Sequence, residues 1–293
     1  MTFQAPDSGN EHIAFIGGGN MASALIGGLL KRGLLASRIQ VIEPFSEQRA
    51  RLAQQFQVEV SEAPGEALQR ASLVVWAVKP QTFRDAAAQS RAHTGSALHL
   101  SVAAGIRSDT IAGWLGTERV VRAMPNTPAL IGQGMTALFA RPAASAADRQ
   151  AAERVVQTTG ELLWLEEEAQ LDAVTALSGS GPAYVFYFIE AMVQAGTEMG
   201  LSHAQAHQLA IGTFVGASAL AKEATEPPDV LRARVTSKGG TTHAALALME
   251  QNGIKAQFMQ AIHAARRRAQ EMGDEFGDEF GEEFGALGFS PRA

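Results

Sequence analysis

Near its start the chain reads His12-Ile13-Ala14-Phe15-Ile16-Gly17-Gly18-Gly19-Asn20-Met21-Ala22, and this stretch decides the fold. An apolar strand runs directly into a glycine turn, and the next residues have the character of a helix. The spacing is G-x-G-x-x-A: Gly17 allows the tight turn, Gly19 lets a pyrophosphate approach the backbone, and Ala22 lets the helix pack near the strand. The helix N-terminus then faces the negative charge. The pattern predicts a dinucleotide site, although glycines after a strand also occur in ordinary turns.

Strand and helix signals alternate along the first half of the chain, as a doubly wound parallel sheet requires. We expect further strands at 39–43, 73–77, 97–102, 119–123, 135–139 and 161–165, and covering helices at 47–56, 81–92 and 108–115. After about Glu166 only helical patterns remain, and Ser202 and Gln205 are spaced as a capping box. The sequence therefore predicts an α/β fold, in which an N-terminal Rossmann-like sheet is followed by an all-α domain.

Two domains are expected, because 293 residues exceed the size at which a single core usually splits. We place a dinucleotide-binding domain at residues 1–165 and an all-helical substrate and dimerisation domain at residues 166–273. The small apolar residues of the helical part suit a dimer interface, although a monomeric helix bundle would use them as well. The tail, residues 274–293, contains three near copies of Asp-Glu-Phe-Gly and is expected to be disordered.

Composition excludes several classes of function. The formal net charge of -6 argues against a nucleic-acid partner, because such proteins usually carry a basic face. The chain has no cysteine, which excludes disulfides and fits a reducing compartment. Residues 1–10 do not resemble a secretory signal, so we expect a cytoplasmic protein without a membrane partner. The apolar segment 182–199 is interrupted by charges, which favours a buried core helix over a membrane span. His203 and His207 are spaced to share a metal but have no third ligand in view, so no metal is predicted.

Three further loops follow predicted strands, where an open α/β sheet binds its ligands. They are Ala77-Val78-Lys79-Pro80, Val102-Ala103-Ala104-Gly105 and Met124-Pro125-Asn126-Thr127-Pro128. The small residues of the second loop leave room for a flat ring. The predicted cofactor-binding residues are Ile16, Gly17, Gly18, Gly19, Asn20, Met21, Glu43, Ala77, Val78, Lys79, Pro80, Val102, Ala103, Ala104, Pro125 and Asn126.

The cofactor's identity depends on the end of the second strand. Glu43 stands where an acidic residue bonds the ribose 2′-hydroxyl of NAD. Four polar or basic residues follow it and would accommodate a 2′-phosphate, namely Ser46, Gln48, Arg49 and Arg51. From these residues alone, the cofactor could be either NAD or NADP.

With these motifs the chain resembles the pyrroline-5-carboxylate reductases over nearly its whole length up to about Gly273. The resemblance rests on five segments in order, at residues 15–21, 77–80, 122–128, 177–184 and 235–242. It implies hydride transfer from NADPH, with NADH as the alternative donor, to the C5 imine carbon of 1-pyrroline-5-carboxylate, which gives L-proline. Because a protonated imine is already electrophilic, positioning supplies most of the acceleration.

The resemblance places the substrate on the loop before a late helix, at Ser237, Gly239, Gly240, Thr241 and Thr242. The Thr242 hydroxyl would contact the imine nitrogen as the catalytic group. The residues themselves agree, because backbone N–H groups at a helix N-terminus suit a carboxylate, but a threonine there is also an ordinary helix cap. Lys238 departs from the family, which commonly has proline there, and adds a cation beside an anionic substrate.

Two other predicted substrate-side residues lie upstream of this loop. Ser178 belongs to the segment that opens the long core helix. Glu168 is a candidate substrate contact, with a solvated turn at 166–168 as the alternative.

Two other functions share much of this pattern. A dehydrogenase of the 3-hydroxyacid type would use a lysine in the first long helix of the second domain, and residues 182–199 contain none. A non-catalytic nucleotide-binding regulator would share everything except turnover. Reduction of the imine separates the three possibilities.

Overall fold

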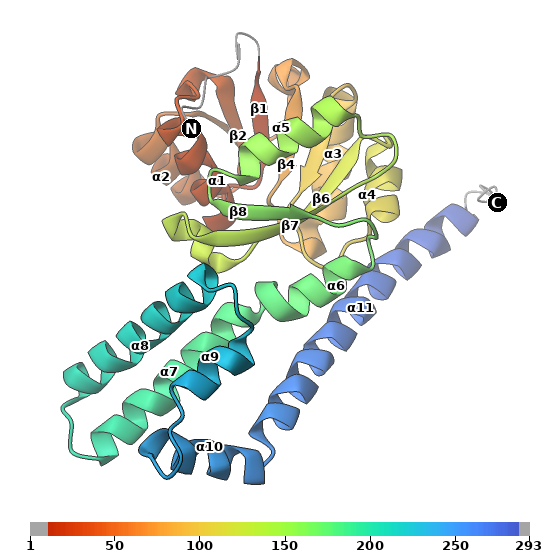
Figure 1. The fold of residues 1–293 in the computed structure, drawn as a ribbon. Coiled ribbons are helices and arrows are strands. Elements are labelled where there is room, and N and C mark those ends of the chain that lie inside the picture. Colours follow the sequence, from red (N-terminus) through yellow and green to blue (C-terminus); the bar gives the residue numbers. More distant parts are fainter. Residues whose placement is uncertain (1–10, 287–293) are drawn as a thin grey trace. The chain divides into compact units, whose positions relative to one another are not determined.

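A computed structural model describes residues 11–286 of the chain (Figure 1). Residues 1–10, where a secretory signal is not expected, and residues 287–293 of the tail lie outside the described part. The described strands form one sheet in the order β3-β2-β1-β4-β5-β6-β7-β8. Their bounds are β1 Ile13–Ile16, β2 Ile39–Ile42, β3 Glu59–Ser61, β4 Leu73–Trp76, β5 Leu98–Ser101, β6 Val120–Met124, β7 Gly134–Ala140 and β8 Gly160–Trp164.

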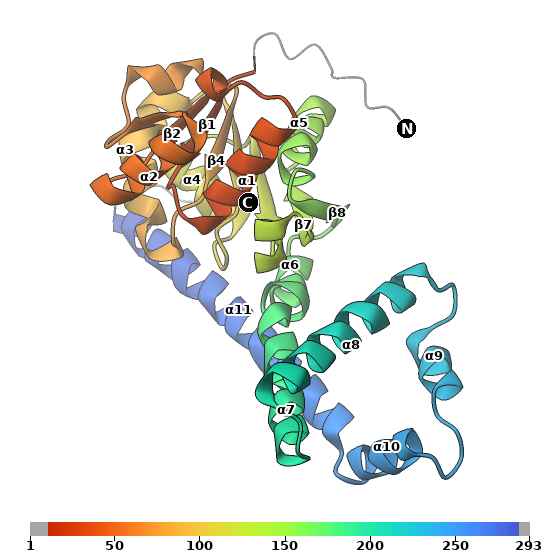
Figure 2. The ribbon, with the colours of Figure 1, turned by 90° about the vertical axis from the view of Figure 1, so that its left-hand side faces the viewer.

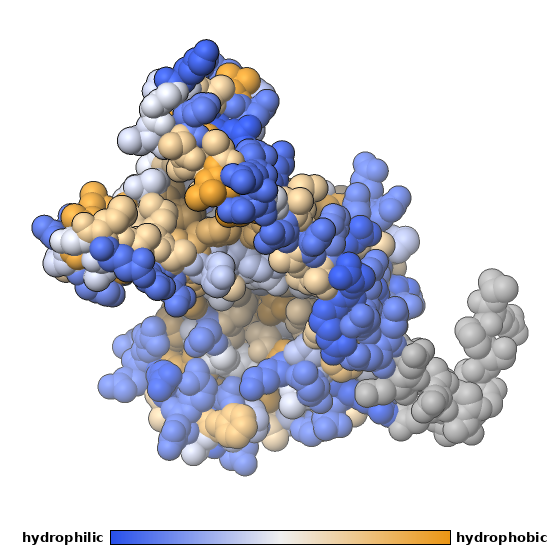
Figure 3. All heavy atoms as spheres, turned by 90° about the horizontal axis from the view of Figure 1, so that it is seen from below, coloured by the Kyte–Doolittle hydropathy of each residue, from blue (hydrophilic) through white to orange (hydrophobic). Residues whose placement is uncertain are grey.

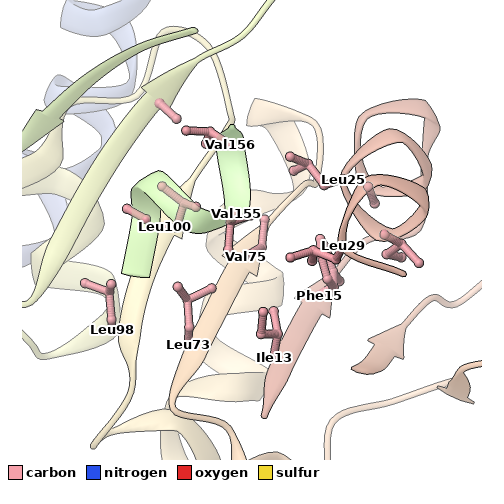
Figure 4. Close-up of a cluster of buried hydrophobic side chains, with 14 of the residues drawn as sticks. Ile13, Phe15, Leu25, Leu29, Leu73, Val75, Leu98, Leu100, Val155 and Val156 are labelled. Atoms are coloured by element: carbon pink, nitrogen blue, oxygen red, sulfur yellow. The ribbon is translucent and has the colours of Figure 1, made fainter. Parts of the chain in front are cut away.

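Helices cover both faces of this sheet, so its central strands are buried on both sides (Figures 1 and 2). On one face, α1 (Asn20–Lys31), α2 (Ser46–Phe56) and α5 (Ala146–Val156) pack against alternate residues of the strands, such as Phe15 and Val75 (Figure 4). On the other face, α3 (Pro80–Thr94) and α4 (Ser108–Leu115) pack against Trp76 and its neighbours. Continuous apolar strands such as Ile13–Ile16 suit this two-sided burial.

The predicted fold class is confirmed, with two differences in the sheet. Residues 59–61 form a short edge strand that the sequence analysis does not predict, because only three residues, none of them buried, leave no hydrophobic pattern. Strand β7 runs antiparallel to β6, whereas the other neighbours pair in parallel. Only the short helical turn η3 (Thr127–Ile131) joins them, and a connection of this length returns the chain antiparallel instead of crossing over.

The later part of the chain is helical, and its predicted capping box is present. Ser202 caps α8 through its side chain, and Gln205 bonds back to the Ser202 amide. The elements are α6 (Gln170–Val174), the π-helical turn η4 (Thr175–Gly179), α7 (Gly181–Glu198), α8 (His203–Glu223), α9 (Pro228–Arg234), α10 (Thr241–Gln251) and α11 (Ile254–Ala286).

Contacts within the chain divide it into two compact units, and the limits of these units differ from the predicted domain limits. The first unit takes the chain up to Gly179 and again from Ala265, and the second is Ser180–Ala264. Residues 166–179 belong to the first unit because Leu171 and Asp172 are buried there and Asp172 is ion-paired to Arg107. The tail also differs from expectation, since 274–286 continue α11 as helix.

Helix α7 is not the buried core helix that the sequence analysis expects. Within the single chain only Val193 and Gly196 of this helix are buried, and Phe186 and Tyr187 are 64% and 69% exposed. Exposed apolar side chains also occur on α8 and α10, and Figure 3 shows orange and tan residues reaching the surface. No helix within residues 11–286 is long and apolar enough to cross a bilayer.

Candidate active site

The glycine turn after β1 has the backbone that the motif requires. Gly17 has φ +92°, and a Cβ added there would lie 2.7 Å from the Ala77 carbonyl oxygen, so only glycine fits. Gly19 is exposed and a Cβ there would meet nothing within 4 Å. Gly19 is also the N-cap of α1 and makes no side-chain cap bond, so the first N–H groups of α1 are left for an anion.

Glu43 supports this turn from the end of β2. Its Oε2 accepts the Gly18 N–H at 2.9 Å, and its Oε1 accepts the Phe45 N–H at 3.0 Å. The side chain of Gln48 donates to the Gly18 carbonyl, so the turn is held from two directions. Glu43 is only 6% exposed, and both of its carboxylate oxygens are used by backbone amides. The predicted contact of Glu43 with a ribose would have to share these oxygens.

The other predicted cofactor loops lie at the same edge of the sheet. Strands β1, β4, β5 and β6 are consecutive parallel neighbours, so the loops that follow their carboxyl ends meet at one edge. Lys79 is exposed and is the N-cap of α3, with Pro80 in the first turn. Ala103 is buried, and its N–H donates to the Ser101 hydroxyl at 3.3 Å. The structure therefore brings these predicted residues to the edge where an open α/β sheet binds ligands.

Asn126 joins a predicted cofactor loop to a predicted substrate-side segment. Its Oδ1 accepts the Met135 N–H at 2.9 Å, and its Nδ2 donates to the Ser178 hydroxyl at 3.2 Å. Ser178 lies in the π-helical turn η4, a conformation found frequently at functional sites. The next residue, Gly179, packs against Met124. The terminal methyl group of Met124 occupies the space that a Cβ on Gly179 would need.

Glu168 lies in a turn in which Glu166 and Glu167 are exposed, but its own side chain is half-buried and held in an ion pair. One of its oxygens accepts from the guanidinium of Arg122 and from the Ser108 N–H, both at 2.6 Å, and the other accepts from the Ser108 hydroxyl. Burial raises the pKa of this carboxyl, but the Arg122 charge and the Ser108 hydrogen bonds outweigh it and leave the pKa below its usual value. The predicted contact of Glu168 with substrate is not visible in these bonds and stays a prediction.

The residues proposed to hold the substrate carboxylate lie around the start of α10. Gly239 has φ +75°, and the Gly240 N–H donates to the Ser237 carbonyl at 3.1 Å, which closes a tight turn. The N-cap of α10 is Gly240, and no side chain caps it. Thr241 and Thr242 are therefore the first residues of the helix and not its caps, and both are exposed. The alternative in which either threonine is the N-cap is wrong.

Metal ligands do not gather in the part of the chain that the structure describes. His203 and His207 stack with ring centroids 6.2 Å apart on α8. Among residues 11–286, no group of three or more histidine, cysteine, aspartate or glutamate side chains is arranged to hold a metal ion.

Several residues that brace this edge were not predicted from the sequence, namely Arg122, Ser108, Arg107 and Asp172. Gln48 was expected near a 2′-phosphate, and its bond to the glycine turn was not predicted. One signal was available: Arg122 is a charged residue inside the otherwise apolar strand β6, and a buried charge requires a partner. The identity of that partner, Glu168, has no sequence signature.

Two family models match parts of the chain. The model of the family described as pyrroline-5-carboxylate reductase dimerisation matches residues 168–272. The model described as NADP oxidoreductase coenzyme F420-dependent matches residues 12–105.

Relatives match most of the chain. Pyrroline-5-carboxylate reductase of Pseudomonas aeruginosa is 45% identical over 262 residues, covering 89% of this chain and 96% of the relative. The enzyme of the same name from Haemophilus influenzae is 41% identical over 89% of this chain and 97% of its own length. A Coxiella burnetii structure of that name superposes with a TM-score of 0.84 at 34% identity, covering 90% of this chain and 99% of the other. A Plasmodium falciparum pyrroline carboxylate reductase structure with NADP bound gives 0.81 at 27% identity, covering 90% and 98%. The chain therefore belongs to the pyrroline-5-carboxylate reductase family.

Proposed function

We propose how the residues of this chain divide the work of the family's reaction, reduction of 1-pyrroline-5-carboxylate to L-proline. The observation that carries the proposal is the open Gly19 position at the uncapped start of α1, within a chain 45% identical to a pyrroline-5-carboxylate reductase. When bound, the nicotinamide cofactor supplies the hydride for the C5 carbon of the imine. The protein's own task is to bind and orient, because the protonated imine needs little further activation.

The glycine turn fits the pyrophosphate of such a cofactor. The φ of Gly17 and the bonds from Glu43 and Gln48 hold the turn, and the missing side chain of Gly19 leaves its backbone open. The loops at Ala77–Pro80, Val102–Ala104 and Pro125–Asn126 would receive the remaining parts of the cofactor. The predicted residues Ile16, Asn20 and Met21 flank this turn, Ile16 at the end of β1 and the other two at the start of α1.

We propose NADPH as the preferred donor. Two backbone N–H groups already donate to the Glu43 carboxylate, so its oxygens are less available to accept a hydrogen bond from a ribose 2′-hydroxyl. Ser46 is exposed at the first position of α2, whose N-cap Phe45 makes no side-chain bond, and Arg51 is exposed further along this helix. Arg49 braces the β2–α2 turn through the Glu43 and Pro44 carbonyls. A higher kcat/KM with NADH than with NADPH would show this preference to be wrong.

The substrate carboxylate would lie at the start of α10, where backbone N–H groups and hydroxyls are exposed together. Thr242 would hold the ring nitrogen through its hydroxyl, which can accept from a protonated imine or donate to a neutral one. Ser237, Gly239, Gly240 and Thr241 shape the turn or line it, and Ser178, which accepts a hydrogen bond from Asn126, is proposed as a substrate-side residue of the first unit.

Substitution of Thr242 tests this role. Thr242→Val removes the hydroxyl with little change in shape and is expected to lower kcat/KM for the imine about 10- to 100-fold, the effect of a lost bond to a charged group. NADPH affinity should stay unchanged. Thr213→Val, at an exposed hydroxyl on α8 that bonds the Leu209 carbonyl, is the matched control and should behave as wild type. Wild-type kcat/KM in Thr242→Val would remove this residue from the site.

Self-association through the helical domain is also proposed, and the occupant of its apolar surface is a second copy of the chain. The match to a dimerisation family over 168–272 and the exposure of Phe186, Tyr187 and Val215 support it. A cytoplasmic location stays a prediction that the cysteine-free composition fits.

The two rival functions are separated by one assay. Oxidation of NADPH is followed with 1-pyrroline-5-carboxylate, and a 3-hydroxy acid with NADP is the control. Turnover of the hydroxy acid alone would favour the dehydrogenase, and binding of NADPH with no turnover of either would favour a regulator.

A further inference from the structure

The loop between β5 and α4 is held by several side chains from other parts of the chain. It contains Val102, Ala103 and Ala104, whose small side chains leave room for a flat ring of the cofactor, the ribose or the nicotinamide, and it ends where Ser108 begins α4. Gly105 turns the chain between them with φ +76°. Its geometry depends on residues that the sequence analysis did not connect with the cofactor.

Glu168 ties the far end of this loop to the sheet. Both the N–H and the hydroxyl of Ser108 donate to the Glu168 carboxylate, and the Arg122 guanidinium on β6 donates to it as well. Arg122 is 5% exposed, so its charge depends on this partner. With these three donors in place, Glu168 joins the start of α4 to strand β6 in a fixed position.

A second set of contacts holds the same loop from its other side. The Arg107 guanidinium bonds both oxygens of Asp172, at 3.1 and 2.9 Å. The middle of α11 packs on the loop: a Cβ at Gly105 would lie 3.0 Å from the terminal methyl of Met272, and one at Gly273 would lie 2.6 Å from Arg107 Nε. The loop between Ala104 and Ser108 therefore has little freedom to move.

We propose that Glu168 is a positioning residue for the nicotinamide half of the cofactor, and that it acts by holding the 102–108 loop and not by touching substrate. The inference rests on the proposed function, in which this loop receives part of the cofactor, and it takes that part to be the nicotinamide ring. Glu168 has no contact with the glycine turn that would receive the pyrophosphate, so its influence should be confined to one half of the cofactor.

Two ligands separate this role from a general loss of structure. NADPH uses the whole site, whereas adenosine 2′,5′-bisphosphate uses only the adenine half. Glu168→Gln keeps an acceptor for Arg122 but removes the charge and one Ser108 bond. It is expected to raise the Kd of NADPH about tenfold and to leave the Kd of adenosine 2′,5′-bisphosphate within about twofold of wild type. Both constants are measured by calorimetry without imine, on protein shown to be folded by circular dichroism.

Variants at two other residues serve as a control and as a second test of the inference. Glu167→Gln, at an exposed glutamate next to Glu168, should change neither constant. Ser108→Ala leaves the Arg122–Glu168 pair intact and should weaken NADPH in the same direction by about threefold. Equal weakening of both ligands, or a raised KM for the imine with unchanged NADPH affinity, would overturn the inference. Gly19→Ala tests the cofactor site of the proposed function separately, because NADPH binding is measured without turnover. If both Glu168→Gln and Gly19→Ala leave the Kd of NADPH unchanged, the proposed function is wrong, and not only the inference about Glu168.

Discussion

His99 makes the stability of the first unit depend on pH. It lies on β5, is 1% exposed, and its Nδ1 accepts a hydrogen bond from the Trp76 indole N–H at 3.0 Å. Burial is the main reason that its pKa is lowered to about 4; the Thr94 backbone opposes the shift, and the charge of Arg119 adds to it. The ring is therefore neutral in the folded protein at pH values where an unfolded histidine, with a pKa of 6.5, takes up a proton.

The sign and size of the effect follow from these two values. Between pH 6.5 and 4 the unfolded chain binds the extra proton, so the free energy of unfolding falls as the pH is lowered. Complete titration of this one group removes about 3 kcal/mol, and about 2 kcal/mol of that is lost between pH 7.5 and pH 5. Above pH 7.5 His99 contributes almost no further pH dependence.

Urea unfolding at pH 7.5 and pH 5 measures this loss, provided that it is compared with His99→Gln. Glutamine does not titrate and keeps an acceptor for the Trp76 N–H, so this variant should lack about 2 kcal/mol of the wild-type difference between the two pH values. The comparison of the two proteins cancels the contribution of other groups to the pH dependence of stability. These groups include Asp148 and Glu168, whose lowered pKa values place their titration at lower pH. His263→Gln, at an exposed histidine, is the control and keeps the wild-type difference. Equal pH dependence in wild type and His99→Gln would refute the reasoning.

Three other predictions follow from single positions. Gly19→Ala should keep the free energy of unfolding within about 1 kcal/mol of wild type and weaken NADPH binding at least about tenfold, whereas Gly17→Ala should also lose about 2 kcal/mol of stability because of its positive φ. Calorimetry measures NADPH binding, and urea unfolding measures stability. Normal NADPH binding in Gly19→Ala would contradict the proposed pyrophosphate site. Lys238→Ala should raise the KM for the imine a few-fold if its ammonium reaches the substrate carboxylate, and an unchanged KM rejects that contact. Phe186→Glu should lower the mass measured by light scattering toward that of a single chain, while Leu35→Glu, equally exposed in the first unit, should not.

Much of the fold could be read from local patterns. The strand before Gly17 and the Ser202–Gln205 capping box are local features, in which neighbours in sequence also make the structure. The antiparallel β7 could not be read in this way, because strand direction depends on the length of the connection and not on the strand's own residues. The burial of α7 was also misjudged, because an apolar helix has the same pattern whether its own chain or a second copy covers it.

By itself, the sequence determined the strand–turn–helix that begins the chain, the α/β class and the family, since each depends on residues within a few positions of one another or on motifs in a set order. Only the tertiary structure decided which groups the Glu43 and Glu168 carboxylates bond. A carboxylate's partners are chosen by folding: Gly18 meets Glu43, and Arg122 meets Glu168, across intervals of the chain that carry no spacing rule. Burial removes water from these groups, so each must find its hydrogen bonds among the residues that the fold places beside it.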